Sequence, residues 1–357
     1  MAVVVGWDIG GAHLKAARAE NGRIVATVQV ASPLRLGLER LAQSFVEAKA
    51  QIGAADRHAI TMTGELADTF ASRSEGVVSL TQAALLALAP TPVLLYAGRA
   101  GFVGPEKADR HVADIASANW FASAFVAGKA MRSALFMDMG STTTDIIPVI
   151  GGKVATRGYT DAERLSSGEL VYTGLVRSFL MATESRAPVA GRWTGLIHEN
   201  FANMADVHRI LGTLPDDADQ MMTADGRPKT AAASRARLAR MVGGDADDAD
   251  DVAWTALAQW FAEAQTRAVT DGAMLVLSQG GLPPDAPIVA GGVGAGVLRE
   301  VARRLGRDCI DFDTVLDVAL DARAAASACA PAAAVAILAS LSGHELRNRA
   351  DHQKDNL

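Results

Sequence analysis

Two stretches of the sequence combine carboxylates, glycines and hydroxyl groups in a pattern that suits phosphate chemistry. The first, at residues 3–11, is an apolar run that ends in Asp8, Gly10 and Gly11. Glycines leave backbone N–H groups accessible to phosphate oxygens, and an aspartate oxygen is a suitable ligand for Mg²⁺. Lys15 lies on the next predicted strand, from which it can reach a terminal phosphate. The alternative is a hairpin in which Asp8 and Lys15 are only structural.

The second stretch, at residues 138–145, places three hydroxyl residues and two aspartates around one glycine. Hydroxyl groups and turn amides donate hydrogen bonds to phosphate, while Asp138 and Asp145 are candidates for cation binding or proton transfer. A threonine-rich hairpin would explain the hydroxyl residues, since threonine favours strands, but it does not require the second aspartate. The sequence therefore predicts a phosphate-binding turn made of Gly140, Ser141, Thr142 and Thr143.

The two stretches are copies of each other. Asp8 and Asp138 have the same separation as Gly10 and Gly140, and the same offset aligns Asn21-Gly22 with Gly151-Gly152. Such glycine pairs are typical of hairpin turns because they accept positive φ. We therefore predict an α/β protein of two related lobes, each opening with a three-strand β-meander, with a cleft between them.

The boundaries of these lobes follow from the repeat. We expect a first lobe at 1–130 and a second at 131–330, with a variable acidic insertion at 187–255, a late glycine-rich loop at 287–296, and a charged tail at 344–357. A helix at 331–343 is expected to pack back on the first lobe. The late loop contains Gly291, Gly292 and Gly294, but it fits the dinucleotide-binding fingerprint only loosely, and a dinucleotide fold does not explain the repeat.

Other segments are predicted from periodicity and from turn residues. Strands are expected at 59–64 and 92–96, the start of a helix at 65–71, and further helices at 117–130, 164–182 and 297–305.

Composition narrows the class of protein. The chain has 357 residues, of which 50% are hydrophobic, and its net charge of −6 argues against a nucleic-acid partner. Its two cysteines, Cys309 and Cys329, match no zinc or disulfide spacing. No apolar run reaches the roughly 20 residues of a membrane span. We expect a cytoplasmic protein with no membrane partner, and a homo-oligomer is compatible with the sequence.

The phosphate turns and the late glycine loop resemble the actin/hexokinase/heat-shock-chaperone superfamily (ASKHA), whose two lobes close around a phosphate-bearing ligand. Within it, residues 6–15 and 138–145 resemble the hydantoinase/oxoprolinase group. Together with 63–66, 117–120 and 168–174, they look like the methanofuran-biosynthesis branch, found beside the tetrahydromethanopterin-linked one-carbon pathway.

That resemblance implies a transferase that joins an (aminomethyl)furanmethyl diphosphate to the phenol of a tyramine- or tyrosine-type acceptor and releases pyrophosphate. Displacement at the furan CH₂ builds positive charge on carbon, and fixed amides, a lysine and a divalent cation such as Mg²⁺ stabilise the departing oxygens. On this interpretation Asp8 and Asp138 bind the metal, and Lys15 and the two turns hold the diphosphate. The remaining assignments are a base (Asp145 or Glu65), a phosphate contact or packed strand residue (His13), and substrate contacts (Asn119, Trp120, Arg157 and Glu169).

Two other functions remain open. The first is an ATP-dependent kinase or an ATP-driven amide hydrolase of the hydantoinase/oxoprolinase type, in which the late glycine loop would hold adenosine. Full oxoprolinase-type chains are much longer, which counts against the hydrolase. The second is a nucleotide-state switch without catalysis, but the sequence shows neither a peptide-binding domain nor a basic helix-turn-helix.

Overall fold

The computed structural model describes the backbone of residues 2–354 and the side chains of 2–342, and the chain divides into two compact units. Unit 1 comprises Met1–Ala134, Val149–Val154 and Asp311–Leu357, and unit 2 comprises Leu135–Pro148 and Ala155–Ile310. Residues 311–330, which the sequence placed in the second lobe, thus lie in unit 1. The reason is that the strand β14 ends at Asp311 and the following turns and helix pack against the first sheet.

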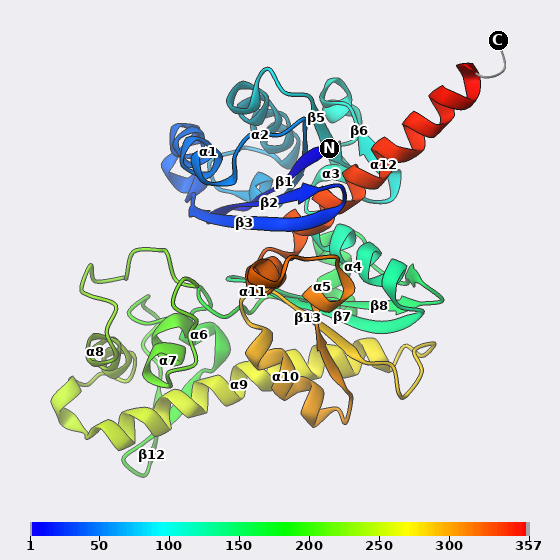
Figure 1. The fold of residues 1–357 in the computed structure, drawn as a ribbon. Helices are drawn as coiled ribbons and strands as arrows, with labels where there is room; N and C mark the ends of the chain where they lie inside the picture. The colour runs from blue at the N-terminus through cyan, green and yellow to red at the C-terminus, as the bar shows by residue number, and fades with distance from the viewer. Residues whose placement is uncertain (1, 355–357) are drawn as a thin grey trace. The chain divides into compact units, whose positions relative to one another are not determined.

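The sheet of unit 1 has the strand order β3-β2-β1-β4-β5-β6 (Figure 1). β1 pairs with β2 in antiparallel fashion and with β4 in parallel fashion, so the β-meander continues into a parallel sheet. The strands are β1 (Val3–Ile9), β2 (His13–Glu20), β3 (Arg23–Ala31), β4 (Arg57–Met62), β5 (Val93–Tyr96) and β6 (Phe102–Val103).

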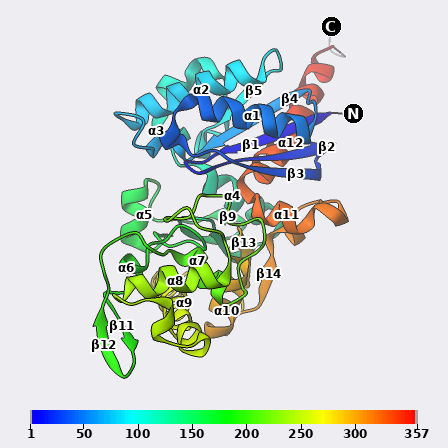
Figure 2. The ribbon, with the colours of Figure 1, turned by 90° about the vertical axis from the view of Figure 1, so that its left-hand side faces the viewer.

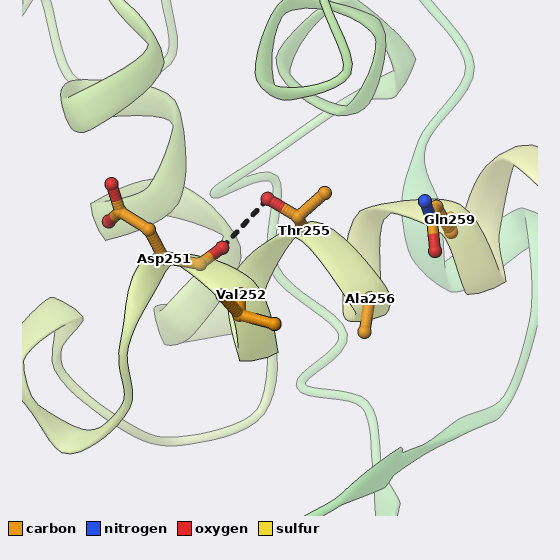
Figure 3. A pocket seen from close by; sticks show the side chains of 5 residues that line it. All are labelled: Asp251, Val252, Thr255, Ala256 and Gln259. Atoms are coloured by element: carbon orange, nitrogen blue, oxygen red, sulfur yellow. Dashed lines mark hydrogen bonds between the residues drawn. The ribbon is translucent and has the colours of Figure 1, made fainter.

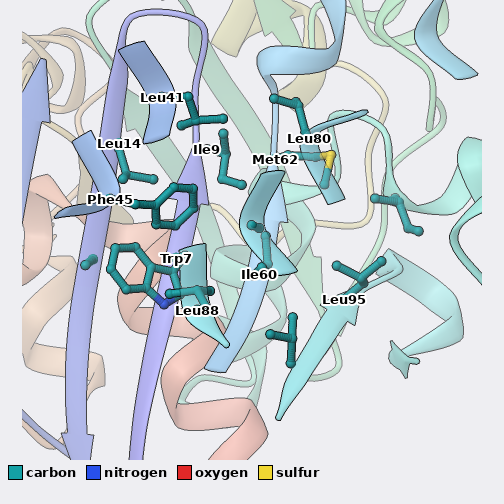
Figure 4. Packing of buried hydrophobic residues seen from close by; sticks show 14 of the residues in the cluster. Trp7, Ile9, Leu14, Leu41, Phe45, Ile60, Met62, Leu80, Leu88 and Leu95 are labelled. Atoms are coloured by element: carbon teal, nitrogen blue, oxygen red, sulfur yellow. The ribbon is translucent and has the colours of Figure 1, made fainter. Parts of the chain in front are cut away.

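Helices cover both faces of this sheet. One face packs against α1 (Leu38–Ile52) and α2 (Arg73–Leu88), and the ring of Trp7 lies 5.1 Å from that of Phe45 in this core (Figure 4). The other face packs against α12 (Ala330–Lys354). The approach is so close that a Cβ on Gly6 would lie 2.1 Å from the backbone oxygen of Ala332, so only glycine fits at that position.

The sheet of unit 2 has the order β10-β8-β7-β13-β14, with β9 pairing with β8. β10 is antiparallel to β8, and β13 is parallel to β7. In both sheets the first strand of the meander therefore lies between the second strand and a later parallel strand, which confirms the predicted fold of two related α/β sheets. The strands are β7 (Ser133–Met139), β8 (Thr144–Ile150), β9 (Lys153–Val154), β10 (Leu170–Val171), β13 (Ile288–Gly291) and β14 (Cys309–Asp311).

The long helix α9 (Asp251–Leu277) joins two apolar cores of unit 2; Figure 1 shows it along its length and Figure 2 nearly end-on. Near its start, Trp254 and Phe261 pack with α7 and α8, whereas Val269 and Ala273 near its end pack on the second sheet. The acidic insertion is therefore ordered around the first half of α9. α6 (Leu180–Thr183) precedes the insertion, whose own elements are β11 (Arg186–Val189), β12 (Arg192–Gly195), α7 (Met204–Ile210) and α8 (Ala231–Met241).

The remaining helices are α3 (Val112–Ile115), α4 (Asn119–Ala130), α5 (Asp161–Ser167), α10 (Ala295–Arg304) and α11 (Arg323–Ala328). The strands predicted at 59–64 and 92–96 and the helices predicted at 117–130 and 297–305 are confirmed as β4, β5, α4 and α10. Within the described residues no single helix is both long and apolar enough to span a membrane. The bent helix pair Leu320–Ala328 and Ala330–Ser342 reaches the required length and apolar composition only when its two helices are taken together.

Two of the predicted helices are wrong. The helix expected at 164–182 ends at Ser167, because Gly168 adopts a left-handed conformation with φ +78° and the chain continues into β10. The helix expected to start at 65–71 is a single 3₁₀ turn. The true helix, α2, begins at Arg73, where the Ser72 side chain accepts a hydrogen bond from the Glu75 amide.

Candidate functional site

The first glycine turn, residues 10–12, is fixed by backbone hydrogen bonds from two directions; we call it turn 1. The Gly10 amide donates to the carbonyl oxygen of His13 at 3.0 Å, and the Leu34 amide donates to that of Gly11 at 3.0 Å. A Cβ on Gly10 would lie 3.1 Å from the His13 oxygen, whereas a Cβ on Gly11 would meet no atom within 4 Å. Turn 1 is thus rigid on its protein side and open at Gly11.

Asp8 and Lys15 are direct neighbours across the β1–β2 pair, and the Asp8 side chain is nearly buried. Lys15 Nζ donates a 2.9 Å hydrogen bond to the backbone oxygen of Ala328, the last residue of α11. A cation is stabilised at this end of a helix, where carbonyl groups point outward. The ammonium group has three hydrogens, so this contact gives Lys15 a structural partner without excluding the predicted phosphate contact.

The structure brings together two of the family-like motifs of unit 1. Glu65 is buried, and it accepts a 2.7 Å hydrogen bond from the hydroxyl of Ser117, which precedes α4. Asn119 begins α4 and accepts from the amide of Trp120 at 2.7 Å, and the Trp120 side chain is buried. His13, at the start of β2, is also buried. These positions favour packing roles for Trp120 and His13, and they place Glu65 beside a hydroxyl group.

The second glycine turn, residues 140–143, is turn 2, and a neighbouring loop supports it. The Gly140 amide donates to the Thr143 oxygen at 2.9 Å, and the Arg177 amide donates to the Ser141 oxygen at 2.8 Å. Gly174 lies so close that a Cβ there would be 2.5 Å from the Thr142 nitrogen. We call residues 173–178 the supporting loop, because they hold turn 2 through its carbonyl groups.

The late glycine loop packs against the end of β7, directly before turn 2. Gly291 is the register partner of Asp138 in the parallel β13–β7 pair. Gly292 has φ +81°, and a Cβ on it would lie 2.3 Å from Asp138 Oδ1. The Gly294 amide donates to the Met139 oxygen at 2.9 Å. Gly291, Gly292 and Gly294 were predicted to contact a phosphate or cofactor, and in the structure Gly292 allows the loop to approach the predicted metal-binding carboxylate.

Turn 2 offers hydrogen-bond donors that a phosphate would satisfy. Ser141 Oγ is buried and has no hydrogen-bond partner among the residues that the structure describes. Across the same residues, no group of three or more histidine, cysteine, aspartate or glutamate side chains could hold a metal ion. Mg²⁺ is commonly held by one or two carboxylates together with water and phosphate oxygens. The Asp138 carboxylate, at the end of the strand before turn 2, and the Ser141 hydroxyl are the groups that would hold Mg²⁺ and phosphate here.

The carboxylates beyond turn 2 already have protein partners. Asp145 forms an ion pair with the buried guanidinium of Arg164; burial raises the pKa of Asp145, while Arg164 opposes that rise. Glu169 is fully buried and accepts from the amides of Arg157 at 2.7 Å and Gly158 at 2.9 Å. Glu169 thus positions the loop at 157–158, and a direct substrate contact by its carboxylate would require these bonds to break.

Two shallow cavities lie in unit 2, and neither is lined by the phosphate turns. One, of about 580 Å³, is lined by Arg157 and residues of α5, so the exposed Arg157 side chain is accessible to a ligand. The other, of about 310 Å³, lies along the first turns of α9 (Figure 3), where the Thr255 hydroxyl is bonded to the Asp251 oxygen at 2.7 Å.

Sequence comparison gives related proteins of known name. A model of the hydantoinase/oxoprolinase family matches residues 56–340. The (4-{4-(2-(gamma-L-glutamylamino)ethyl)phenoxymethyl}furan-2-yl)methanamine synthase of Methanocaldococcus jannaschii is 31% identical over 252 residues, which cover 70% of this chain and 74% of that protein. The synthase of the same name from Methanococcus vannielii is 33% identical over 121 residues, or 34% of this chain and 54% of that protein.

Solved structures show the same fold at low identity. The activator of the 2-hydroxyisocaproyl-CoA dehydratase from Clostridium difficile, with bound ADPNP, has a TM-score of 0.50 and 12% identity, and the match covers 97% of both chains. The nucleotide-free acetone carboxylase structure has a TM-score of 0.53 and 10% identity, covering 86% of this chain and 68% of that chain. At these identities the likeness concerns the fold alone.

Proposed function

The chain belongs to the hydantoinase/oxoprolinase family, and from this premise we propose that it is an ether-forming transferase of methanofuran-type cofactor biosynthesis. The observation that carries the proposal is the identity to the two named synthases, which agrees with the family predicted from the motifs. The printed name of their product contains a phenoxymethyl group on a furan, which is an aryl ether. We propose the same bond for this chain, between a furanmethyl diphosphate and a phenol.

In the proposed reaction the phenol oxygen attacks the furan CH₂ carbon, the bond from that carbon to the diphosphate breaks, and pyrophosphate leaves with the bonding electrons. The phenol proton passes to a base. Turn 2 supplies the Ser141 hydroxyl and fixed amides, which stabilise negative charge as it grows on the leaving oxygens. Asp138 would hold Mg²⁺, and the bound metal neutralises diphosphate charge. Turn 1, with Asp8 and Lys15, is proposed as a further phosphate-binding element.

Asp145 and Glu65 both remain candidates for the base. Asp145 is tied to Arg164, and this ion pair lowers its affinity for a proton, whereas burial raises it. Glu65 is buried and accepts a hydrogen bond from the Ser117 hydroxyl. Glu65→Gln and Asp145→Asn, compared in single-turnover experiments, separate the two roles, because loss of the true base slows ether formation without weakening pyrophosphate binding.

One observation supports the alternative, an ATP-dependent kinase or amide hydrolase. The glycine loop packs on Asp138 and Met139, directly before turn 2, where a nucleotide could extend from a bound phosphate. We propose a cytoplasmic location and the tetrahydromethanopterin-linked pathway as the setting, on the strength of the resemblance only.

The test is product analysis with purified protein, Mg²⁺, a furanmethyl diphosphate and either tyramine-type or tyrosine acceptors, with ATP in a parallel reaction. We expect pyrophosphate and an aryl ether from wild type, and loss of both in Asp138→Ala and Lys15→Ala. Lys49→Ala is the matched control for Lys15, because Lys49 also donates to a backbone oxygen near the end of a helix, at Ala87. Formation of ADP without an ether would refute the transferase and favour the alternative.

A further inference from the structure

A buried chain of polar side chains lies behind turn 2, and the reaction proposed above does not use it. Gln265 is fully buried in α9, between the core of the insertion and the core under the second sheet. A buried amide is costly unless all its hydrogen-bonding groups are satisfied. Gln265 meets this condition through contacts with two other segments of unit 2.

The contacts define which way the Gln265 amide points. Its Nε2 lies 2.8 Å from the backbone oxygen of Gly174 and 3.0 Å from Thr173 Oγ1. A carbonyl oxygen only accepts, so the NH₂ group must face the supporting loop and Oε1 must face His208 Nε2, at 2.9 Å. His208 therefore carries its hydrogen on Nε2, and its Nδ1 accepts from the hydroxyl of Thr213 at 2.8 Å.

The histidine is suited to this neutral form. His208 is buried on α7, and burial lowers its pKa, with the Gln265 contact as an opposing cause. Neutral His208 has one donor nitrogen and one acceptor nitrogen, which match the Gln265 oxygen and the Thr213 hydroxyl. The chain Thr213–His208–Gln265 is thus satisfied at every polar atom on it.

The chain ends on the loop that supports turn 2. The Thr173 oxygen accepts a 2.7 Å bond from the Thr144 hydroxyl, directly after turn 2. Gly174 lies against the Thr142 nitrogen, and its own amide donates a hydrogen bond to Ser178 Oγ at 2.8 Å. Displacement of the Gly174 carbonyl would therefore move the backbone that contacts Thr142.

We propose that Gln265, oriented by His208, is a positioning residue that sets the supporting loop and thereby the phosphate-binding amides of turn 2. Neither side chain touches the ligand in this arrangement. The identity of the ligand as a diphosphate rests on the proposed function, whereas the mechanical link from α9 to turn 2 does not.

The link is tested first without any ligand, by amide hydrogen exchange. Gln265→Met keeps the length of the side chain but removes its hydrogen bonds, and Thr266→Val is the matched control, since Thr266 is also buried on α9 but bonds only to its own helix at Ala262. We expect exchange in residues 174–177, whose amides donate to Ser178 and to the carbonyl groups of turn 2, to accelerate about tenfold or more in Gln265→Met alone. Equal exchange there in Gln265→Met and wild type would overturn the positioning role.

A second pair of variants keeps the test decisive if Gln265→Met does not fold. His208→Gln preserves a donor near the Nε2 position, whereas His208→Leu removes it. We expect the Kd for inorganic pyrophosphate with Mg²⁺ to rise about tenfold in His208→Leu and to stay within about twofold of wild type in His208→Gln. Equal affinities in the two variants would overturn the proposal. Absence of pyrophosphate binding to wild type would count against the proposed function instead, and hydrogen exchange in the same His208 pair then decides the positioning role.

Discussion

Replacement of Gly292 by alanine tests whether the late glycine loop must approach Asp138. Two effects make alanine unfavourable at position 292 in the folded state. The backbone there has a left-handed φ of +81°, and the added Cβ would lie 2.3 Å from both Asp138 Oδ1 and the Met139 oxygen. The conformational cost is about 1–2 kcal/mol for a residue with a Cβ. The steric cost of overpacking is typically about 1–3 kcal/mol, because backbone atoms must shift. We therefore expect Gly292→Ala to lower the free energy of unfolding by about 2–5 kcal/mol.

Gly280 is the matched control, because its φ of +80° is nearly the same and a Cβ there would meet nothing within 4 Å. Gly280→Ala should lower the free energy of unfolding only by the conformational cost, about 1–2 kcal/mol, and should keep full activity. Urea unfolding measures both free energies, and Mg²⁺-dependent pyrophosphate release measures the displacement of Asp138. Equal stability losses in the two variants, or full activity in a folded Gly292→Ala protein, would refute the reasoning.

Three further predictions concern individual side chains. Ser141→Ala should weaken pyrophosphate binding by about 10- to 100-fold in calorimetry with little change in stability, because Ser141 Oγ has no hydrogen-bond partner among the described residues. Glu169→Gln should cost about 2–3 kcal/mol in urea unfolding, since an NH₂ group would face a backbone amide in place of an acceptor. The pKa of His58 is lowered from 6.5 to about 4 by burial and by Lys49, and its Nδ1 accepts from Trp7 Nε1. As the pH falls, the unfolded chain therefore binds a proton at this histidine before the folded chain does. The free energy of unfolding of wild type should fall by about 3 kcal/mol between pH 7 and pH 4, and that of His58→Gln by correspondingly less. Unfolding measured as a function of pH gives both values.

The insertion at 187–255 illustrates what the sequence could not predict. The sequence predicted only a variable acidic insertion there, yet Asp206, Asp225 and the fully buried Arg237 form an ion-pair network inside it. The partners are separated along the chain by other elements, so no local spacing marks the pairing. The same holds for Gln265 and His208, which lie 57 residues apart and whose hydrogen bond no local spacing marks.

The sequence by itself determined the repeated strand–turn–strand units and the aspartates that end their first strands. These features are local: a continuously apolar strand and the glycine turn after it depend on neighbouring residues and recur in two copies. Tertiary structure alone decided the partners of the predicted site residues. Glu169 accepts hydrogen bonds from a backbone loop, and Lys15 donates one to the end of a helix. Gly292 leaves room for the Asp138 carboxylate because it has no Cβ. Each of these contacts joins segments that are distant in the chain and come together only when the sheets and helices pack, so their geometry is a property of the folded units.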